Sequence, residues 1–307
     1  MSYPAVSKLP GDLDTTAHYT GTATLLNSKA LEAGDVKNAV AKNVPVTIDR
    51  RIHVTGTDGD NASVDDNSTM KGPGGIDVSG NAKYVIDRTT MEAASGDHGG
   101  DVEPAEGLVF TLPLHPEQRD YTVWVSDLQS AEPLKYLGEA TVEGRDVYKY
   151  QVKSTGPLKN PALLKTLPPA LPKALVEATA QALPAQTRDS LLAALPSMPA
   201  NIPLTYVASA DVMLFADKTL GVPLSSETGK GVVANVKLAD GTMIPLLPIV
   251  DVKAASTPES IANSVSNANS KAKALSAVSM WLPLGLLVLG LLLLVAAWLR
   301  RVKPVAA

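Results

Sequence analysis

The chain has no cysteine and few aromatic residues. Among its 307 residues Cys is absent, which excludes disulfides, thiolate metal sites and cysteine nucleophiles, and aromatic residues make up only 4%. A core therefore has to be built from Val, Leu, Ile and Ala. The 27 basic and 31 acidic side chains leave a net charge of −4, which does not attract a phosphate backbone. We expect no nucleic-acid partner.

Motifs for catalysis and metal binding are missing as well. The four histidines lack the spacing of a metal site; they are His18, His53, His98 and His115. The segment 95–101 holds Ser, His and Asp within seven residues, whereas a catalytic triad draws on residues distant in sequence. The acidic cluster over 58–67 departs from a calcium loop at Ala62, Ser63 and Thr69. We therefore expect no enzyme, no metal and no cofactor.

A long apolar run lies near the C-terminus. Residues 280–299 carry no charge, and a helix of that length spans roughly 30 Å of hydrocarbon. This run predicts one transmembrane helix, followed by a basic cytoplasmic tail over 300–307. Five residues would anchor it at the membrane interfaces, namely Trp281, Trp298, Arg300, Arg301 and Lys303. The tail on the cytoplasmic side places the preceding domain outside the cell membrane.

An exported domain needs an N-terminal signal, and the first forty residues contain no apolar segment. Two alternatives remain open. Either a membrane helix precedes Met1 in the natural protein, or the chain is tail-anchored with its domain in the cytoplasm. The basic tail and the acidic domain favour the first alternative.

The segment before the apolar run has the features of a helix start. Thr257-Pro258-Glu259 combines a hydroxyl cap, a proline at the first helical position and an acid near the positive end of the helix dipole. Apolar residues then recur at three- and four-residue spacing, at Ile261, Val265, Ala268, Ala272 and Leu275. The pattern predicts a juxtamembrane stalk helix over 257–279, with a flexible Ser/Asn/Ala linker as the alternative.

Residues 1–256 are expected to form one extracytoplasmic β-rich domain. Runs of β-branched and aromatic residues, broken by Gly, Asp, Asn and Pro, predict antiparallel strands. The expected strands cover 20–26, 44–54, 82–87, 107–114, 121–125, 134–143, 146–154, 204–216, 222–224, 231–238 and 244–252. Glu143-Gly144-Arg145-Asp146 predicts a hairpin turn. Asp87 and Asp217 each follow an apolar strand, where the carboxylate can accept hydrogen bonds from turn N–H groups.

A Leu-, Ala- and Pro-rich block interrupts the strands at about 157–203. Its prolines leave two main helices, Lys173–Leu183 and Gln186–Leu195. Six apolar residues form a candidate face for a ligand or partner, namely Leu175, Val176, Leu183, Leu191, Leu192 and Leu195. Helices that cap a β core are the alternative. The expected fold class is mainly β with a helical insertion (α+β), an antiparallel β ectodomain followed by a juxtamembrane helix and one C-terminal transmembrane helix.

Several short motifs occur in an order that resembles a known family. They are Leu9-Pro10-Gly11-Asp12-Leu13-Asp14, Tyr19-Thr20-Gly21-Thr22-Ala23-Thr24, Val44-Pro45-Val46-Thr47, Tyr84-Val85-Ile86-Asp87-Arg88, Gly107-Leu108-Val109-Phe110 and Tyr121-x-x-Trp124. In this order they are similar to the actinobacterial porin PorA family of membrane-anchored ectodomain proteins of unknown function. The resemblance covers nearly the whole chain. It implies an N-terminal membrane helix, which this chain lacks, and an acid where Val125 stands.

The family name implies a pore in the cell envelope. One uncharged helix and rather polar strands enclose no water, so a pore would require an oligomer. Membrane helices around an antiparallel domain with a helical cap are also similar to class B scavenger receptors, whose ectodomains carry lipid. The leading hypothesis is a membrane-anchored envelope protein whose extracytoplasmic domain binds or relays apolar envelope lipids. A subunit of an oligomeric channel and a structural envelope protein are the alternatives. The expected partners are the lipid bilayer, envelope lipids and other envelope proteins.

Overall fold

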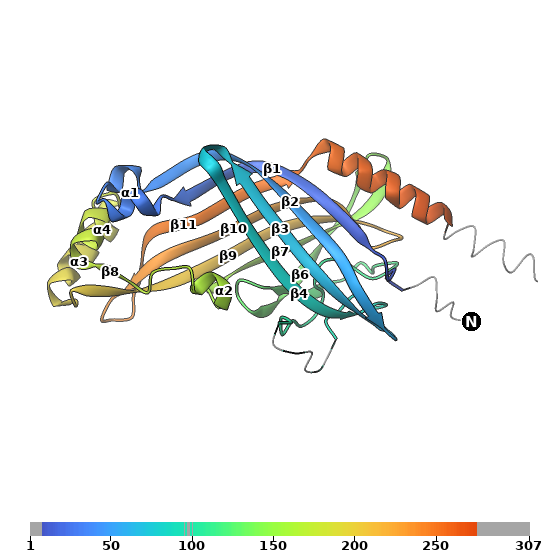
Figure 1. Ribbon diagram of the computed structural model, residues 1–307, viewed down its shortest axis with the longest axis horizontal. Helices are drawn as coiled ribbons and strands as arrows, with labels where there is room; N and C mark the ends of the chain where they lie inside the picture. The colour runs from blue at the N-terminus through green and yellow to red at the C-terminus, as the bar shows by residue number, and fades with distance from the viewer. Residues whose placement is uncertain (1–7, 95, 97–98, 100, 275–307) are drawn as a thin grey trace, which may run out of the picture.

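One long antiparallel sheet dominates the computed structural model, which describes residues 8–94, 96, 99 and 101–274 (Figure 1). The strand order is β4-β3-β2-β1-β11-β10-β9-β7-β6-β5, and β8 pairs with β9. The strands are β1 (Asp14–Leu26), β2 (Val40–Asp58), β3 (Asn61–Gly72), β4 (Ile76–Asp87), β5 (Tyr121–Val125), β6 (Ser130–Val142), β7 (Arg145–Pro157), β8 (Ala170–Pro172), β9 (Asn201–Asp217), β10 (Pro223–Lys237) and β11 (Met243–Ser256). The helices are α1 (Ser28–Glu32), α2 (Pro161–Leu164), α3 (Lys173–Ala180), α4 (Ala185–Ala194), three short 3-10 turns, and a helix over 258–274.

The sheet folds over on itself. Figure 1 shows β2, β3 and β4 crossing obliquely in front of β7, β9 and β10, so two parts of one sheet face each other. The first strand lies beside the last described one, with Tyr19 of β1 opposite Ser256 of β11. At the far ends of the sheet, single bridges through Leu108 and Ala93 connect the edge strands β4 and β5. The fold therefore has an inner face between its two parts and an outer face.

The inner face carries the main hydrophobic core. Alternating residues of each strand point to it, as the period of two in a strand requires. Those that define the face are Ile52 and Val54 of β2, Val64 of β3, Ile86 of β4, Val152 of β7, Ala208 of β9 and Val232 of β10, all buried. We use "inner face" for the side of the sheet in phase with these residues, and "outer face" for the opposite side.

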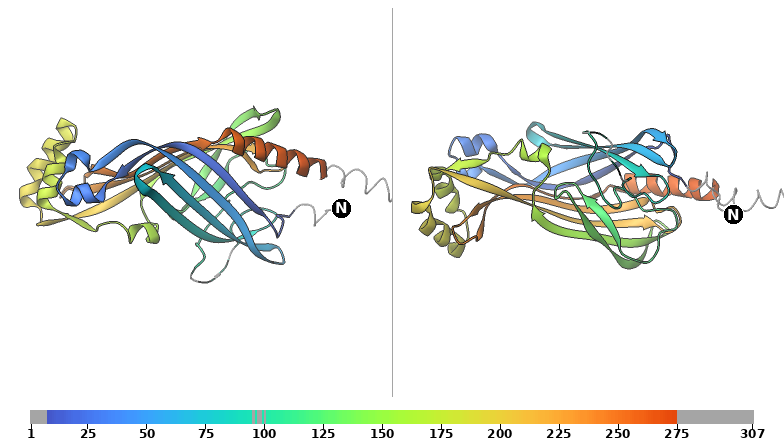
Figure 2. Two further views of the ribbon diagram at one scale, coloured as in Figure 1. Left: turned by 45° about the horizontal axis from the view of Figure 1, so that its top comes forward. Right: turned by 90° about the horizontal axis from the view of Figure 1, so that it is seen from below.

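Short helices close one end of this core. Figures 1 and 2 show α1, α3 and α4 gathered at the same end of the sheet. Val176 of α3 and Leu191 of α4 are fully buried in the main core, which also contains Ile202 and Leu204 of β9. The helices thus pack as a cap on the ends of β9, β10 and β11.

The helix over 258–274 packs on the outer face of the sheet at its other end. Its start is confirmed as expected, since Thr257 Oγ1 accepts a hydrogen bond from the Ser260 N–H at 3.1 Å and Pro258 is the first helical residue. Val265 and Ala268 are buried against Val147 of β7. This helix is therefore part of the folded domain.

The expected fold class is wrong in its transmembrane part, whereas the two helices expected at 173–183 and 186–195 are present as α3 and α4. Prolines divide the block at 157–203 into helices of four to ten residues and one strand, so it forms a small cap on a mainly antiparallel sheet. Within the part of the chain that the structure describes, no helix is long and apolar enough to cross a membrane. The C-terminal transmembrane helix expected at 280–299, with its five anchor residues, lies outside the described residues and receives no support.

Three strand expectations also differ from the structure. The two strands expected at 222–224 and 231–238 form one continuous strand, β10. The segment 107–114 forms no strand and contributes only single bridges through Leu108. Strand β3 is unexpected, because its sequence contains Asp65, Asp66 and Asn67, which favour turns. The structure stabilises it between β2 and β4, where Asp66 pairs with Arg50.

The predicted turns are confirmed. Val142 and Arg145 pair across the hairpin between β6 and β7, and Gly144 has φ +81°. Asp87 Oδ1 accepts hydrogen bonds from the N–H groups of Thr89 and Thr90, both at 2.8 Å. Asp217 makes the equivalent pair at the end of β9.

Candidate functional site

Apolar side chains cover part of the inner face around β1. In one row Tyr19 lies opposite Ile48 of β2, Ile48 opposite Met70 of β3, and Met70 opposite Val78 of β4. Side chains directly opposite one another in an antiparallel pair share a face. The row therefore runs across four strands to the edge strand β4.

Two further rows continue this apolar surface. Ala254 of β11, Gly21 and Val46 form the second row, and Val252, Ala23 and Val44 form the third. Together with the neighbouring pair Leu25 and Val250, these side chains other than Val78 form a second cluster, which meets the main core at Val250. We call this cluster together with Val78 the inner strip: Tyr19, Ala23, Leu25, Val44, Val46, Ile48, Met70, Val78, Val250, Val252 and Ala254.

The inner strip is only partly covered by protein. Ala23, Val46, Val252 and Ala254 are buried at its centre, whereas the other members are partly exposed and Val78 is 56% exposed. On the opposite side of the same strands most exposed residues are polar, although Pro45 and Ala255 are exposed there as well. A partly exposed apolar strip on an inner face is the feature of this fold that best suits an apolar ligand.

Gly21 shapes the middle of the strip. A β-carbon at this position would lie 2.0 Å from the carbonyl oxygen of Lys253 and 2.8 Å from the Ala254 side chain. Any other residue would therefore push β1 and β11 apart. The glycine leaves the second row without a side chain at its centre.

A lysine follows Val252 in the third row. Lys230 of β10 lies opposite Val252 on one side and opposite Ala210 of β9 on the other, so it belongs to the inner face. Both neighbours are buried, yet Lys230 is exposed. None of the ion pairs formed among the described residues includes Lys230.

A buried hydroxyl continues the same row. Ser154 of β7 lies opposite Ala210, on the side away from Lys230. Its Oγ is buried and has no hydrogen-bond partner within the described part of the chain. Ala210 between them has a methyl side chain, so the cation and the hydroxyl are separated by one small residue.

Two carboxylates near the main core, Asp66 and Glu103, are paired with donors. Arg50 donates two hydrogen bonds to Asp66, from Nε at 2.9 Å and from Nη2 at 2.6 Å. Glu103 accepts from Trp124 Nε1 at 2.8 Å and from Ser126 Oγ at 2.7 Å. These contacts provide each of the two carboxylates with hydrogen-bond donors.

Tyr84 lies between these two pairs. Burial, with a smaller effect from the negative charges of Glu103 and Asp66, raises the pKa of the Tyr84 hydroxyl well above its usual range. Tyr84 is therefore neutral at physiological pH and adds a buried aromatic ring to the core, not a charge.

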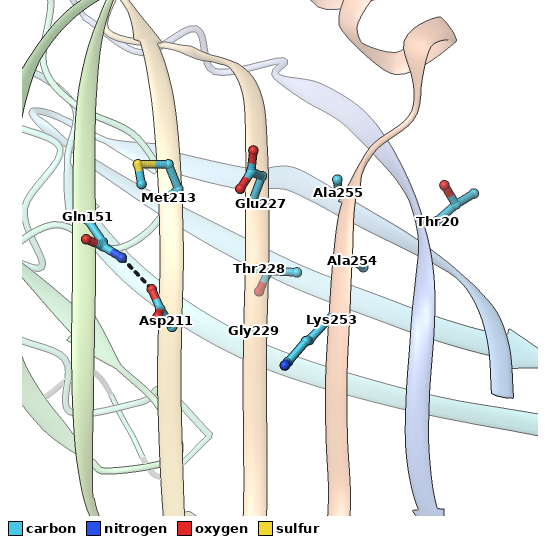
Figure 3. A pocket seen from close by; sticks show the side chains of 10 residues that line it. All are labelled: Thr20, Gln151, Asp211, Met213, Glu227, Thr228, Gly229, Lys253, Ala254 and Ala255. Atoms are coloured by element: carbon cyan, nitrogen blue, oxygen red, sulfur yellow. Dashed lines mark hydrogen bonds between the residues drawn. The ribbon is translucent and has the colours of Figure 1, made fainter. Parts of the chain in front are cut away.

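A shallow hollow of about 530 Å³ lies on the outer face (Figure 3). It exists because Gly229 of β10 places no side chain between Asp211 and Lys253. Asp211 accepts a hydrogen bond from Gln151 Nε2 at 2.6 Å and pairs with Lys153 at 3.5 Å. The charged residues Asp211, Glu227 and Lys253 line this open hollow, which suits an apolar ligand less well than the inner strip does.

The structure places the six predicted apolar residues of the helical block in the cap. Val176, Leu191 and Leu195 are buried, and Leu175, Leu183 and Leu192 are partly buried against the main core. They lie together on the helices as expected, and a ligand on this face stays a prediction. Among the described residues no group of three or more side chains could hold a metal ion.

Sequence reasoning missed the inner strip and Lys230. Their positions depend on the pairing of β1 with β11 and of β10 with β9, which join segments far apart in the chain. One local signal was present. Lys230 stands in phase with Val232 and Ala234, so a charge occupies the apolar phase of its strand.

The fold and the inner face define a class: a β-rich domain in which one antiparallel sheet folds over an apolar face capped by short helices. The chain belongs to the porin PorA family, whose model, described as Porin PorA, matches residues 1–299. The match confirms the family resemblance of the sequence motifs. It supports a role and a location in the cell envelope.

Other comparisons add little. No curated protein matches the chain significantly. A conserved protein of unknown function with a hot dog fold from Alicyclobacillus acidocaldarius is 14% identical over 82% of each chain, with a TM-score of 0.14. An acyl-CoA thioesterase II from Mycobacterium marinum is 10% identical over 79% of this chain and 80% of its own, with a TM-score of 0.14. Neither likeness bears on the fold or the function at such TM-scores.

Proposed function

We propose that this protein is a non-catalytic envelope protein whose β domain binds apolar envelope lipids on the inner strip. The observation that carries the proposal is the exposure of Val78, Met70 and Ile48 in one apolar row of the inner face. Covering apolar surface stabilises a complex by about 25 cal/mol for each Å² removed from water. A lipid chain would supply the cover that the protein leaves incomplete.

The contrast between the two faces supports this proposal. On the outer face the same strands expose mainly polar residues, such as Thr20, Thr47 and Lys253, whereas Ile48, Met70 and Val78 lie on the inner face. Partly exposed Ile, Met and Val side chains that share one face form a contiguous apolar patch, and such patches are typical of binding surfaces.

A neutral apolar dye tests the proposal on the full chain. N-phenyl-1-naphthylamine fluoresces in apolar surroundings, and we expect saturable binding. Val78→Asp should weaken binding, because it places a charge on the strip at an exposed position where folding is little affected. Leu137→Asp is the matched control, since Leu137 is 47% exposed and lies outside the inner strip. Absence of saturable binding, or an equal effect of both variants, would count against the proposal.

A channel subunit is the second candidate. The family is described as a porin, and residues 76–82 of β4 pair only with β3 in the described part of the chain. A free strand edge can pair with a second copy, which would build the oligomer that a pore requires. Stepwise ion currents from the pure protein in planar bilayers would support this candidate. The absence of such currents at protein concentrations at which the chain forms oligomers would exclude it.

A further inference from the structure

The inner strip ends at a cation. Lys230 shares its row with the buried apolar residues Val252 and Ala210, and it is exposed while they are not. An exposed lysine keeps its ammonium in water, while its methylene groups can lie against neighbouring apolar residues. No ion pair among the described residues engages the ammonium of Lys230.

The nearest carboxylates along the strands do not form an ion pair with Lys230. Asp211 follows Ala210 on β9 and Asp251 precedes Val252 on β11, so both belong to the outer face by alternation. Asp211 is already engaged by Gln151 and Lys153. The positive charge of Lys230 is therefore available on the inner face.

Ser154 adds a second donor beside this charge. Its buried Oγ has no hydrogen-bond partner among the described residues, and it lies two strands from Lys230 in the same row. Two strand spacings are about 10 Å, which a lysine side chain largely bridges. A buried hydroxyl without a partner is costly, so a group that accepts from it would stabilise this arrangement.

We propose that Lys230 binds the carboxylate of a long-chain acid whose apolar chain lies along the inner strip. This inference rests on the proposed function and names its ligand class. One ammonium and one hydroxyl donor match the single charge and two oxygens of a carboxylate better than a phosphate dianion, which requires more donors. The distance from β10 to β4 is five strand spacings, about 24 Å, which is on the length scale of a long-chain acid.

The test compares ligands that share a chain and differ in the head group. Oleate, oleyl alcohol and oleoyl lysophosphatidate are titrated into the full chain, its Lys230→Met variant and its Lys253→Met variant. Lys253 is the matched control because it is exposed on the outer face of the adjacent strand β11. Displacement of N-phenyl-1-naphthylamine gives each dissociation constant, and melting temperatures show that the variants are folded.

We expect Lys230→Met to weaken oleate binding by about tenfold to a hundredfold, the effect of one charge-assisted hydrogen bond. Oleyl alcohol binding should be unchanged, and Lys253→Met should alter neither ligand. If oleate and the alcohol both bind and Lys230→Met affects neither, the head-group assignment is overturned while the proposed function stands. If neither ligand binds, both fail. If lysophosphatidate binds more tightly than oleate and loses most on Lys230→Met, the carboxylate assignment is overturned.

Discussion

The guanidinium of Arg145 holds the buried carboxylate of Asp217, with Nε and Nη2 both 2.6 Å from Oδ2. Asp217 is only 1% exposed, and its second oxygen accepts the turn N–H groups of Thr219 and Leu220. Arg145 also donates from Nη1 to Asn269 Oδ1 at 2.7 Å. One ion pair thus connects the start of β7, the end of β9 and the helix over 258–274.

Loss of this carboxylate should destabilise the domain strongly. Asp217→Ala leaves a largely buried guanidinium without its partner, and such changes cost about 3–5 kcal/mol. Asp87→Ala is the control, because Asp87 caps the equivalent turn through two N–H groups and has no buried arginine. Its loss should cost about 1 kcal/mol. Urea unfolding followed by circular dichroism measures both, and equal losses would contradict the role assigned to Arg145.

The burial of Leu191 in the helical cap predicts a loss of stability when its side chain is shortened. Leu191 of α4 is fully buried, so Leu191→Ala should lower the free energy of unfolding by about 2–5 kcal/mol. Leu192→Ala provides the comparison, since Leu192 is only partly buried beside it and should cost less. Chemical denaturation ranks the two variants. A negligible loss at Leu191 would instead indicate that the cap leaves its apolar face to a ligand.

A β-carbon at Gly21 should disturb the pairing of β1 with β11. Because that atom would lie 2.0 Å from the Lys253 carbonyl oxygen, Gly21→Ala has to move one strand and should cost at least about 1–3 kcal/mol. Gly56→Ala on β2 is the control, since nothing lies within 4 Å of its β-carbon position. Thermal melts compare the two. Similar melting temperatures would show that the strands separate more easily than the contact implies.

Alkaline pH should destabilise the domain through Tyr206. Burial raises the pKa of its hydroxyl, which donates to the Pro168 carbonyl oxygen, to about 12. The unfolded tyrosine has a pKa of about 10. The contribution is complete below pH 10 and is lost as the pH rises from about 10 to about 12, because only the unfolded chain ionises there. Tyr206→Phe should flatten this part of the stability profile, measured by urea midpoints across the range. An unchanged slope would show that other tyrosines cause it.

Local signals predicted much of the sheet and little of the candidate site. Glu143-Gly144 and the two capped turns at Asp87 and Asp217 are encoded within a few residues, so the structure confirms them. Strand β3 was not predictable in this way, since Asp66 is accommodated in a strand through its ion pair with Arg50, which lies diagonally across from it on β2. The surface around Lys230 combines six strands, and nothing in one stretch of sequence states which strands become neighbours.

The pairing of β1 with β11 has a consequence for how the chain is made. Tyr19 finds its partner Ser256 only when nearly the whole domain has been synthesised, and neighbours so distant in sequence slow folding. The growing polypeptide therefore stays without its central pair of strands until translation has passed β11. Until then β1 lacks its neighbour β11, and the two parts of the sheet on either side of this pair cannot join.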